Sequence, residues 1–162
     1  MNRTNKMIIT TLLCTLTIIS SHIIAIPLGF VRALPVQHLV NIILAVSVGT
    51  SYAFKGAFMV SLIRNFLGVG SIFAFPGSLF GAMFAGLVFK KTNHLLLTAL
   101  AELMGTSLLG SLCSYPLATF VLGQEVTLFF FLPSFFFSSL VGSIASLFIL
   151  KAFSPYWNYL LK

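Results

Sequence analysis

Acidic side chains are nearly absent from this sequence, which holds two Asp and Glu residues against nine Lys and Arg residues. Charged residues make up 7% of the chain, whereas soluble domains contain about 25%. So few charges cannot cover a water-soluble surface, and the 59% hydrophobic content excludes a disordered chain. The composition predicts an integral membrane protein, and the length of 162 residues predicts one domain over 1–162.

The shortage of acids and of paired histidines also excludes several kinds of chemistry. Glu102 and Glu125 are too few for a carboxylate cluster that binds Mg²⁺ or Ca²⁺. No two of the three histidines, His22, His38 and His94, lie four residues apart, and no cysteine lies close to them in sequence. We therefore expect no metal site. The sequence contains no GxxxxGK[ST] nucleotide loop, no nucleophile elbow and no protease dyad. We therefore expect no enzyme activity and no cofactor, which leaves a binding protein or a transporter subunit.

Cysteines number two, and Cys14 and Cys113 each lie within an apolar run. Without a CxxC motif they are interpreted as small buried hydrophobic residues and indicate no redox compartment. The net charge of +7 is scattered between apolar runs and forms no basic face, so we expect no nucleic-acid partner. Basic residues beside membrane spans instead indicate topology.

Long stretches without any charged residue mark the candidate membrane spans, at 7–31, 33–54, 65–89, 103–124 and 126–150. Pro27 and Gly29 are expected to end the first helix, Lys90–His94 to form a loop, and Gly123–Glu125 to form a turn. A span needs about 20 apolar residues. The turn-like Gly49–Ser51 divides the second stretch, and a shorter and more polar helix follows it up to the Gly68–Ser71 break. The sequence thus predicts an all-α bundle of six transmembrane helices, near 7–26, 36–49, 52–67, 76–89, 95–122 and 126–150.

The basic residues predict the orientation of this bundle in the cell membrane. With the N-terminus inside, Arg32 and Arg64 fall toward the outside and the others fall on or near the cytoplasmic side: Arg3, Lys6, Lys55, Lys90, Lys91, Lys151 and Lys162. This asymmetry predicts that both termini are cytoplasmic. The tail carries interfacial aromatic residues, Tyr156, Trp157 and Tyr159. A signal peptide is the alternative for the first segment, but its apolar core of about 20 residues favours a retained helix.

Arg64 and Glu102 are the two charged residues whose place in the predicted bundle requires an explanation. Arg64, near the outer end of the third helix, either extends to the outer interface or points into the bundle and holds a loop or a ligand. Glu102, in the inner half of the fifth helix, is protonated, paired with a cytoplasmic-side lysine, or part of a buried site.

Several polar and aromatic residues are predicted to lie in the outer third of the bundle: Gln37, His38, Asn41, Phe75, Ser78 and Tyr115. Amide, hydroxyl and imidazole groups beside aromatic faces suit a small neutral or weakly charged aromatic ligand. The alternative is that helix starts attract polar residues without any ligand.

Small residues four positions apart recur along the predicted helices, for example Gly77 with Gly81, Ala82 with Gly86, and Gly142 with Ser146. Such spacings allow helices to approach closely. They predict a tightly packed bundle.

Specific strings resemble the ThiW family: PVQHLVN at 35–41, SLIRNFLG at 61–68 and AFPGS at 74–78. The resemblance continues through Glu102, Gly105-Thr106, Ser114–Pro116 and Pro133–Phe135, and it covers roughly residues 27–145. Proteins of this family are substrate-binding S components of energy-coupling-factor (ECF) vitamin transporters.

The resemblance implies a subunit that captures hydroxyethylthiazole, a thiamine precursor, or a related small heteroaromatic compound. It implies partners as well, a transmembrane T component and two ATPases. Its capture site would lie toward the outside, with these residues as its lining: Gln37, His38, Asn41, Arg64, Asn65, Phe75, Ser78 and Tyr115. One departure is that residues 7–24 contain no Gly or Ala, whereas S components often use a small-residue face on the first helix for docking.

Two other functions remain open at the level of sequence. A self-sufficient secondary transporter or channel would use an intramembrane carboxylate, for which Glu102 is the one candidate. A purely structural subunit of a membrane complex predicts that Arg64→Ala and Asn65→Ala leave ligand uptake unchanged.

Overall fold

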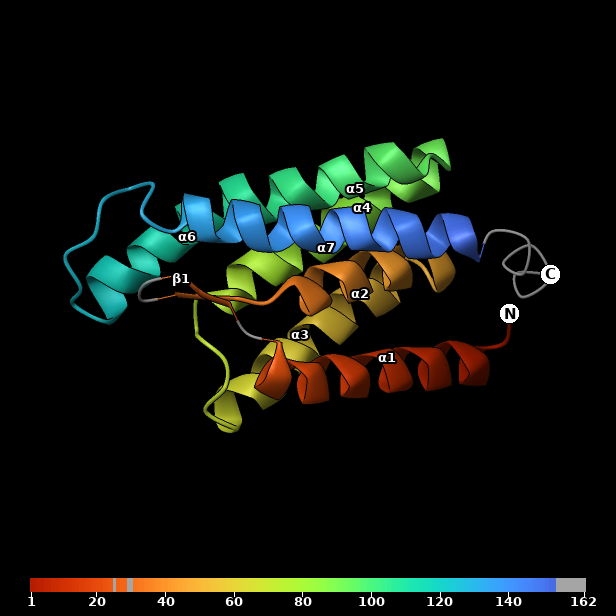
Figure 1. The fold of residues 1–162 in the computed structure, drawn as a ribbon, viewed down its shortest axis with the longest axis horizontal. Coiled ribbons are helices and arrows are strands. Elements are labelled where there is room, and N and C mark those ends of the chain that lie inside the picture. Colours follow the sequence, from red (N-terminus) through yellow and green to blue (C-terminus); the bar gives the residue numbers. More distant parts are fainter. Residues whose placement is uncertain (25, 29–30, 154–162) are drawn as a thin grey trace.

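The computed structural model describes residues 1–24, 26–28 and 31–153. Within these ranges the chain forms six helical rods (Figure 1). The rods are α1 (Arg3–Ile23), α2 (Pro35–Ser47), α3 (Thr50–Phe66), α4 (Ala74–Thr92), a composite rod from Leu95 to Val121, and α7 (Leu132–Ala152). The prediction of a helical fold is therefore confirmed, with the exception of one short hairpin.

The hairpin joins α1 to α2 and was not predicted. Strand β1 (Ile26–Leu28) pairs antiparallel with β2 (Val31–Ala33). The first helix was expected to reach Ile26, but it ends at Ile23. Proline disfavours helical geometry in the residue before it, so Pro27 moves the end of the helix upstream and leaves an extended segment.

Two other predicted boundaries are wrong. Lys90 and Lys91 belong to the last turn of α4 and not to a loop, because that helix continues to Thr92 and is capped by Asn93 in a left-handed conformation (φ 50°). The last helix begins at Leu132 and not near Val126. Pro133 lies in its first turn, where the missing N–H costs no hydrogen bond, so the helix starts there.

The composite rod confirms the prediction of one long helix near 95–122. It consists of α5 (Leu95–Met104), η1 (Gly105–Gly110), α6 (Ser111–Pro116) and η2 (Leu117–Val121), where η1 and η2 are π-helical. Pro116 lies inside the rod and supplies no N–H to the helix ladder, and the second π segment follows it directly.

Helix α2 lies at the centre of the bundle and packs against α7, α4 and α3. Ile42 and Leu44 on this helix are fully buried (0% exposed). Its 13 residues extend about 20 Å, which is shorter than the roughly 30 Å hydrocarbon core of a bilayer. Three helices of the described chain are long and apolar enough to cross a membrane: Arg3–Ile23, Leu95–Val121 and Leu132–Ala152.

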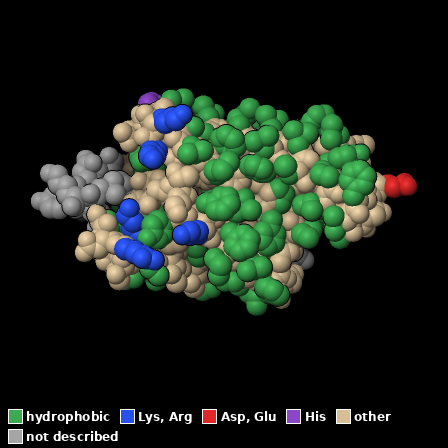
Figure 2. Space-filling model, turned by 180° about the vertical axis from the view of Figure 1, so that it is seen from behind, with side chains coloured by type: hydrophobic (Ala, Val, Ile, Leu, Met, Phe, Trp, Pro, Cys, Tyr) green, Lys and Arg blue, Asp and Glu red, His purple; other side chains and the backbone are tan. Residues whose placement is uncertain are grey.

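The two ends of the molecule differ in charge. Helix α1 begins and α7 ends at one end, while the β1–β2 hairpin lies toward the other (Figure 1). Figure 2 shows Lys and Arg side chains gathered toward one end and an acidic side chain at the opposite tip. Lys6 and Lys90 both line a 350 Å³ pocket at the basic end. The predicted interfacial residues Tyr156, Trp157 and Tyr159 lie outside the described residues, as does Lys162.

Both cysteines fall within helices. Cys14 is buried and belongs to the core formed by α1 with α2, α3 and α4, whereas Cys113 is half-buried. The expectation of a buried apolar environment is confirmed for Cys14 and is met in part by Cys113.

Candidate functional site

A buried contact between His38 on α2 and Glu102 on α5 forms the first part of the site. His38 Nδ1 lies 2.8 Å from Glu102 Oε1, and the Ser139 hydroxyl donates to Glu102 Oε2 at 2.5 Å. The Thr106 hydroxyl lies 3.0 Å from Oε1, and Glu102 is 0% exposed. Glu102 thus lies inside the bundle, and its hydrogen-bond partners in the described part of the chain include no lysine. These contacts offset the cost of burying the group.

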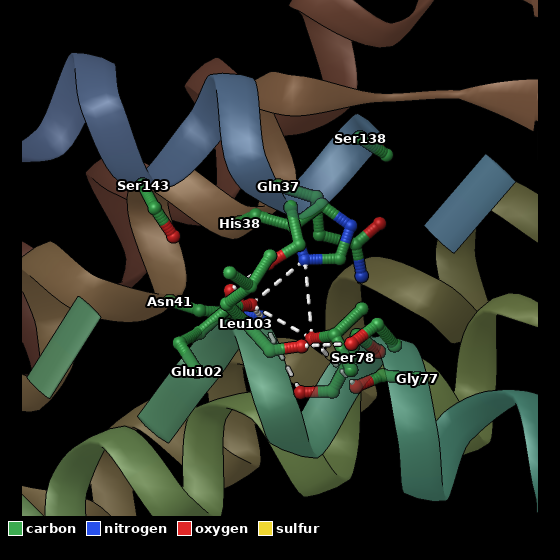
Figure 3. Close-up of polar contacts among 12 residues, drawn as sticks. Gln37, His38, Asn41, Gly77, Ser78, Glu102, Leu103, Ser138 and Ser143 are labelled. Carbon is green, nitrogen blue, oxygen red and sulfur yellow. Dashed lines mark hydrogen bonds and ion pairs between the residues drawn. The ribbon is translucent and has the colours of Figure 1, made fainter. Parts of the chain in front are cut away.

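Helical periodicity and one glycine position this pair. Glu102 and Thr106 are four residues apart, so both project from the same face of the composite rod. Gly81 on α4 lies opposite them, and a Cβ atom there would overlap the Thr106 hydroxyl and lie 2.7 Å from Glu102 Oε1. Figure 3 shows His38 and Glu102 directed toward each other, with Ser138 and Ser143 on α7 to either side.

The second part of the site surrounds Arg64 at the end of α3. Its side chain is 1% exposed and points into the bundle, so it does not extend to the outer interface. Arg64 Nη1 donates to Gln37 Oε1, and Nη2 donates to the Val69 carbonyl oxygen at 3.4 Å. Gln37 Nε2 in turn donates to the Ser61 hydroxyl at 3.0 Å. Arg64 therefore holds the loop between α3 and α4 as well as α2.

Asn41 and Ser78 join the two parts into one network. The Ser61 and Ser78 hydroxyls lie 2.8 Å apart. Asn41 Nδ2 reaches the Ser78 carbonyl oxygen at 3.3 Å and Glu102 Oε1 at 3.5 Å (Figure 3). A continuous path of polar contacts thus runs from Arg64 through the bundle to Glu102.

The structure brings five of the eight predicted lining residues into this network: Gln37, His38, Asn41, Arg64 and Ser78. Asn65 lies beside it and holds the α3–α4 loop through bonds to the carbonyl oxygens of Ser61 (2.8 Å) and Ser71 (3.1 Å). Phe75 packs edge-on against Phe58, with the two ring centroids 5.7 Å apart.

Tyr115 lines a pocket elsewhere in the bundle. This pocket has a volume of about 480 Å³ and is bounded by the segment that follows the composite rod. Its lining consists of Tyr115, Thr119, Gly123, Gln124, Glu125, Val126 and Thr127.

Sequence reasoning missed three hydroxyl residues of the network, Ser61, Thr106 and Ser139. The four-residue spacing of Thr106 from Glu102 was a usable signal. Ser139 also falls in a series of serines on α7, with Ser143 and Ser146 on the same buried side. Within the described residues, no group of three or more His, Cys, Asp and Glu side chains is placed to hold a metal ion.

A family model described as thiamine-precursor transporter protein (ThiW) matches residues 7–155 of the chain. The chain belongs to the ThiW family. No curated protein and no solved structure matches it. ThiW is a transporter family, and the apolar helices of this member agree with a location in a membrane.

Proposed function

We propose that this ThiW protein is the substrate-capture subunit of an ECF-type importer for hydroxyethylthiazole or a closely related small heteroaromatic compound. It would lie in the cell membrane with both termini in the cytoplasm. A transmembrane T component and two ATPases would be its partners, because the sequence has no nucleotide-binding loop of its own.

The observation that carries this proposal is the buried network between Arg64 and Glu102. Polar and charged groups inside a membrane bundle cost several kcal/mol when they serve no purpose, and they commonly mark substrate paths. Here they come from α2, α3, α4, α5 and α7, so the network lies where most helices of the bundle meet.

The position of the network suggests a route for the ligand. Gln37 and His38 lie in the first turn of α2, which directly follows the β1–β2 hairpin. A ligand that enters from the hairpin end would meet these two side chains first. An imidazole and an amide can pair with the ring nitrogen and the hydroxyl group of a thiazole alcohol.

Binding measurements on the purified chain test the proposal. Isothermal titration in detergent, without ATP, should show that hydroxyethylthiazole binds. His38→Ala should weaken this binding by about tenfold or more, because a hydrogen bond to the ligand is lost. Lys91→Gln, at an exposed position on the last turn of α4, is the matched control and should bind as the wild type does.

The outcomes separate the candidate functions. Absence of heat and of any thermal shift with thiazoles would overturn the substrate assignment. Equal affinity of the wild type and the His38→Ala variant would exclude His38 from the capture site.

The His38–Glu102 pair favours one second candidate, a proton-coupled transporter that works alone. Buried titratable pairs recur in proton pathways of membrane proteins. Liposomes that contain only this chain decide between the two functions. Uptake of hydroxyethylthiazole driven by a pH gradient supports the second candidate, and uptake that requires the ATPase partners supports the first.

A further inference from the structure

Arg64 is a buried cation whose hydrogen-bond partners are all neutral. A guanidinium group offers five N–H donors. Those of Arg64 reach the Gln37 side-chain oxygen and, at 3.4 Å, the Val69 carbonyl oxygen. Its Nε has no hydrogen-bond partner in the described part of the chain. A side chain that is 1% exposed thus keeps unused donors and an unpaired charge.

The two acidic residues of the chain do not supply the missing negative charge. Glu125 is exposed, in the segment beyond η2. Both oxygens of Glu102 already accept hydrogen bonds, Oε1 from His38 and Oε2 from Ser139. Among the side chains that the structure describes, at residues 1–24 and 34–153, the acid–base contact found is the one between His38 and Glu102.

A buried cation without a counter-ion is costly, and an anion bound beside it removes that cost. The planar guanidinium group fits carboxylate and phosphate oxygens better than any other side chain does. We infer that Arg64 binds an oxyanion carried by the ligand, a carboxylate or a phosphate monoester on the thiazole side chain. This inference rests on the proposed function and adds that a thiazole with an anionic group on its side chain is preferred to the neutral alcohol.

The loop between α3 and α4 covers this anion site. The N–H groups of Val69 and Gly70 donate to the Arg64 carbonyl oxygen at 3.1 and 2.9 Å, and Asn65 holds Ser71. A Cβ atom on Gly70 would lie 2.8 Å from the Arg64 carbonyl carbon. The loop thus packs on the end of α3 that carries Arg64, whose side chain is buried. A charge-assisted hydrogen bond is stronger in such an environment than at an exposed surface.

A series of three ligands tests the inference on the wild-type chain. Hydroxyethylthiazole is compared by isothermal titration with its phosphate monoester and with the corresponding thiazole acid, in which the terminal CH₂OH is a carboxylate. At least one of the anions should bind about tenfold to hundredfold more tightly than the neutral alcohol. Inorganic phosphate alone should bind far more weakly than the preferred anionic thiazole.

Variants assign the preference to Arg64. Arg64→Gln should remove the preference, so that the anion and the alcohol bind within about threefold of each other, while Arg64→Lys should keep part of it because the charge remains. Lys55→Gln, which removes an exposed charge on the same helix, should leave the preference unchanged. A melting curve of each variant in detergent checks that the bundle is folded.

Three results overturn the inference. If the neutral alcohol binds most tightly, the inference fails while the proposed function stands. If the anion preference survives in Arg64→Gln, the anion is not bound by Arg64. Equal binding of inorganic phosphate and the phosphate monoester shows that the anion is free and not part of a thiazole. If no thiazole of any charge binds, the proposed function fails as well.

Discussion

At the scale of single residues, the two charged side chains inside the bundle have different environments. Glu102 has donors on both oxygens, so its burial is compensated within the chain. Arg64 has neutral acceptors and an unpaired Nε. The first arrangement is typical of a structural anchor, and the second leaves capacity for a partner from outside.

Glu102→Gln tests the anchor. Replacing the carboxyl group by an amide removes one acceptor oxygen from the contacts with His38 and Ser139, and we expect the bundle to lose about 1–3 kcal/mol of stability. Thermal unfolding in detergent measures the loss. Glu125→Gln, at an exposed position, is the control and should change stability by less than about 0.5 kcal/mol. Equal melting temperatures for Glu102→Gln and the wild type would contradict the structural role of the pair.

The sequence predicted much at this scale. A glutamate and an arginine in an almost uncharged chain stand out, and Gln37, His38 and Asn41 repeat on one helix face. Ser139 could not be singled out, because serine is common in this chain and its partner lies 37 positions away in sequence.

At the scale of elements, glycines allow the helices to pack closely around the site. Gly142 on α7 faces α2, and a Cβ atom there would overlap the Pro35 carbonyl oxygen and lie 2.8 Å from His38 Cβ. The sequence predicted this closeness from small-residue spacings such as Gly142 with Ser146. It did not predict which helix lies opposite, because that depends on how the whole bundle folds.

Gly142→Ala tests this helix contact. The new methyl group meets the backbone of α2, which cannot turn away as a side chain can, so α2 and α7 must separate. We expect a loss of about 1–3 kcal/mol in unfolding free energy and weaker ligand binding, since His38 moves with α2. Val141→Ala, on the exposed face of the same helix, is the control. Wild-type stability and affinity in the Gly142→Ala variant would show that the contact is not needed.

At the scale of the whole molecule, the charge asymmetry predicts how the bundle lies in the membrane. Lys90 and Lys91 end α4, directly before the composite rod, whereas Glu125 follows the end of that rod. The 27 residues between Leu95 and Val121 separate these two points by about 40 Å. Basic residues on the end that holds the start of α1 and the end of α7 favour a cytoplasmic location for that end.

Cysteine labelling in intact cells tests this orientation. In a background with Cys14→Ser and Cys113→Ser, Glu125→Cys should react with a membrane-impermeant maleimide added outside. Lys91→Cys should react only after the cells are opened. Both positions are exposed, so access depends on the side of the membrane. Labelling of both variants from the same side would contradict the six-span topology with cytoplasmic termini.

The sequence by itself determined that this is a helical membrane protein of the ThiW family and roughly where most of its helices lie, because long uncharged apolar runs must be helical in a bilayer. Only the tertiary structure decided that α2 is a short buried helix, that His38 pairs with Glu102, and that Arg64 faces inward without a carboxylate partner. These outcomes depend on contacts between residues far apart in sequence. Local composition sets the cost of burying a charge, and the assembled bundle decides which groups offset it.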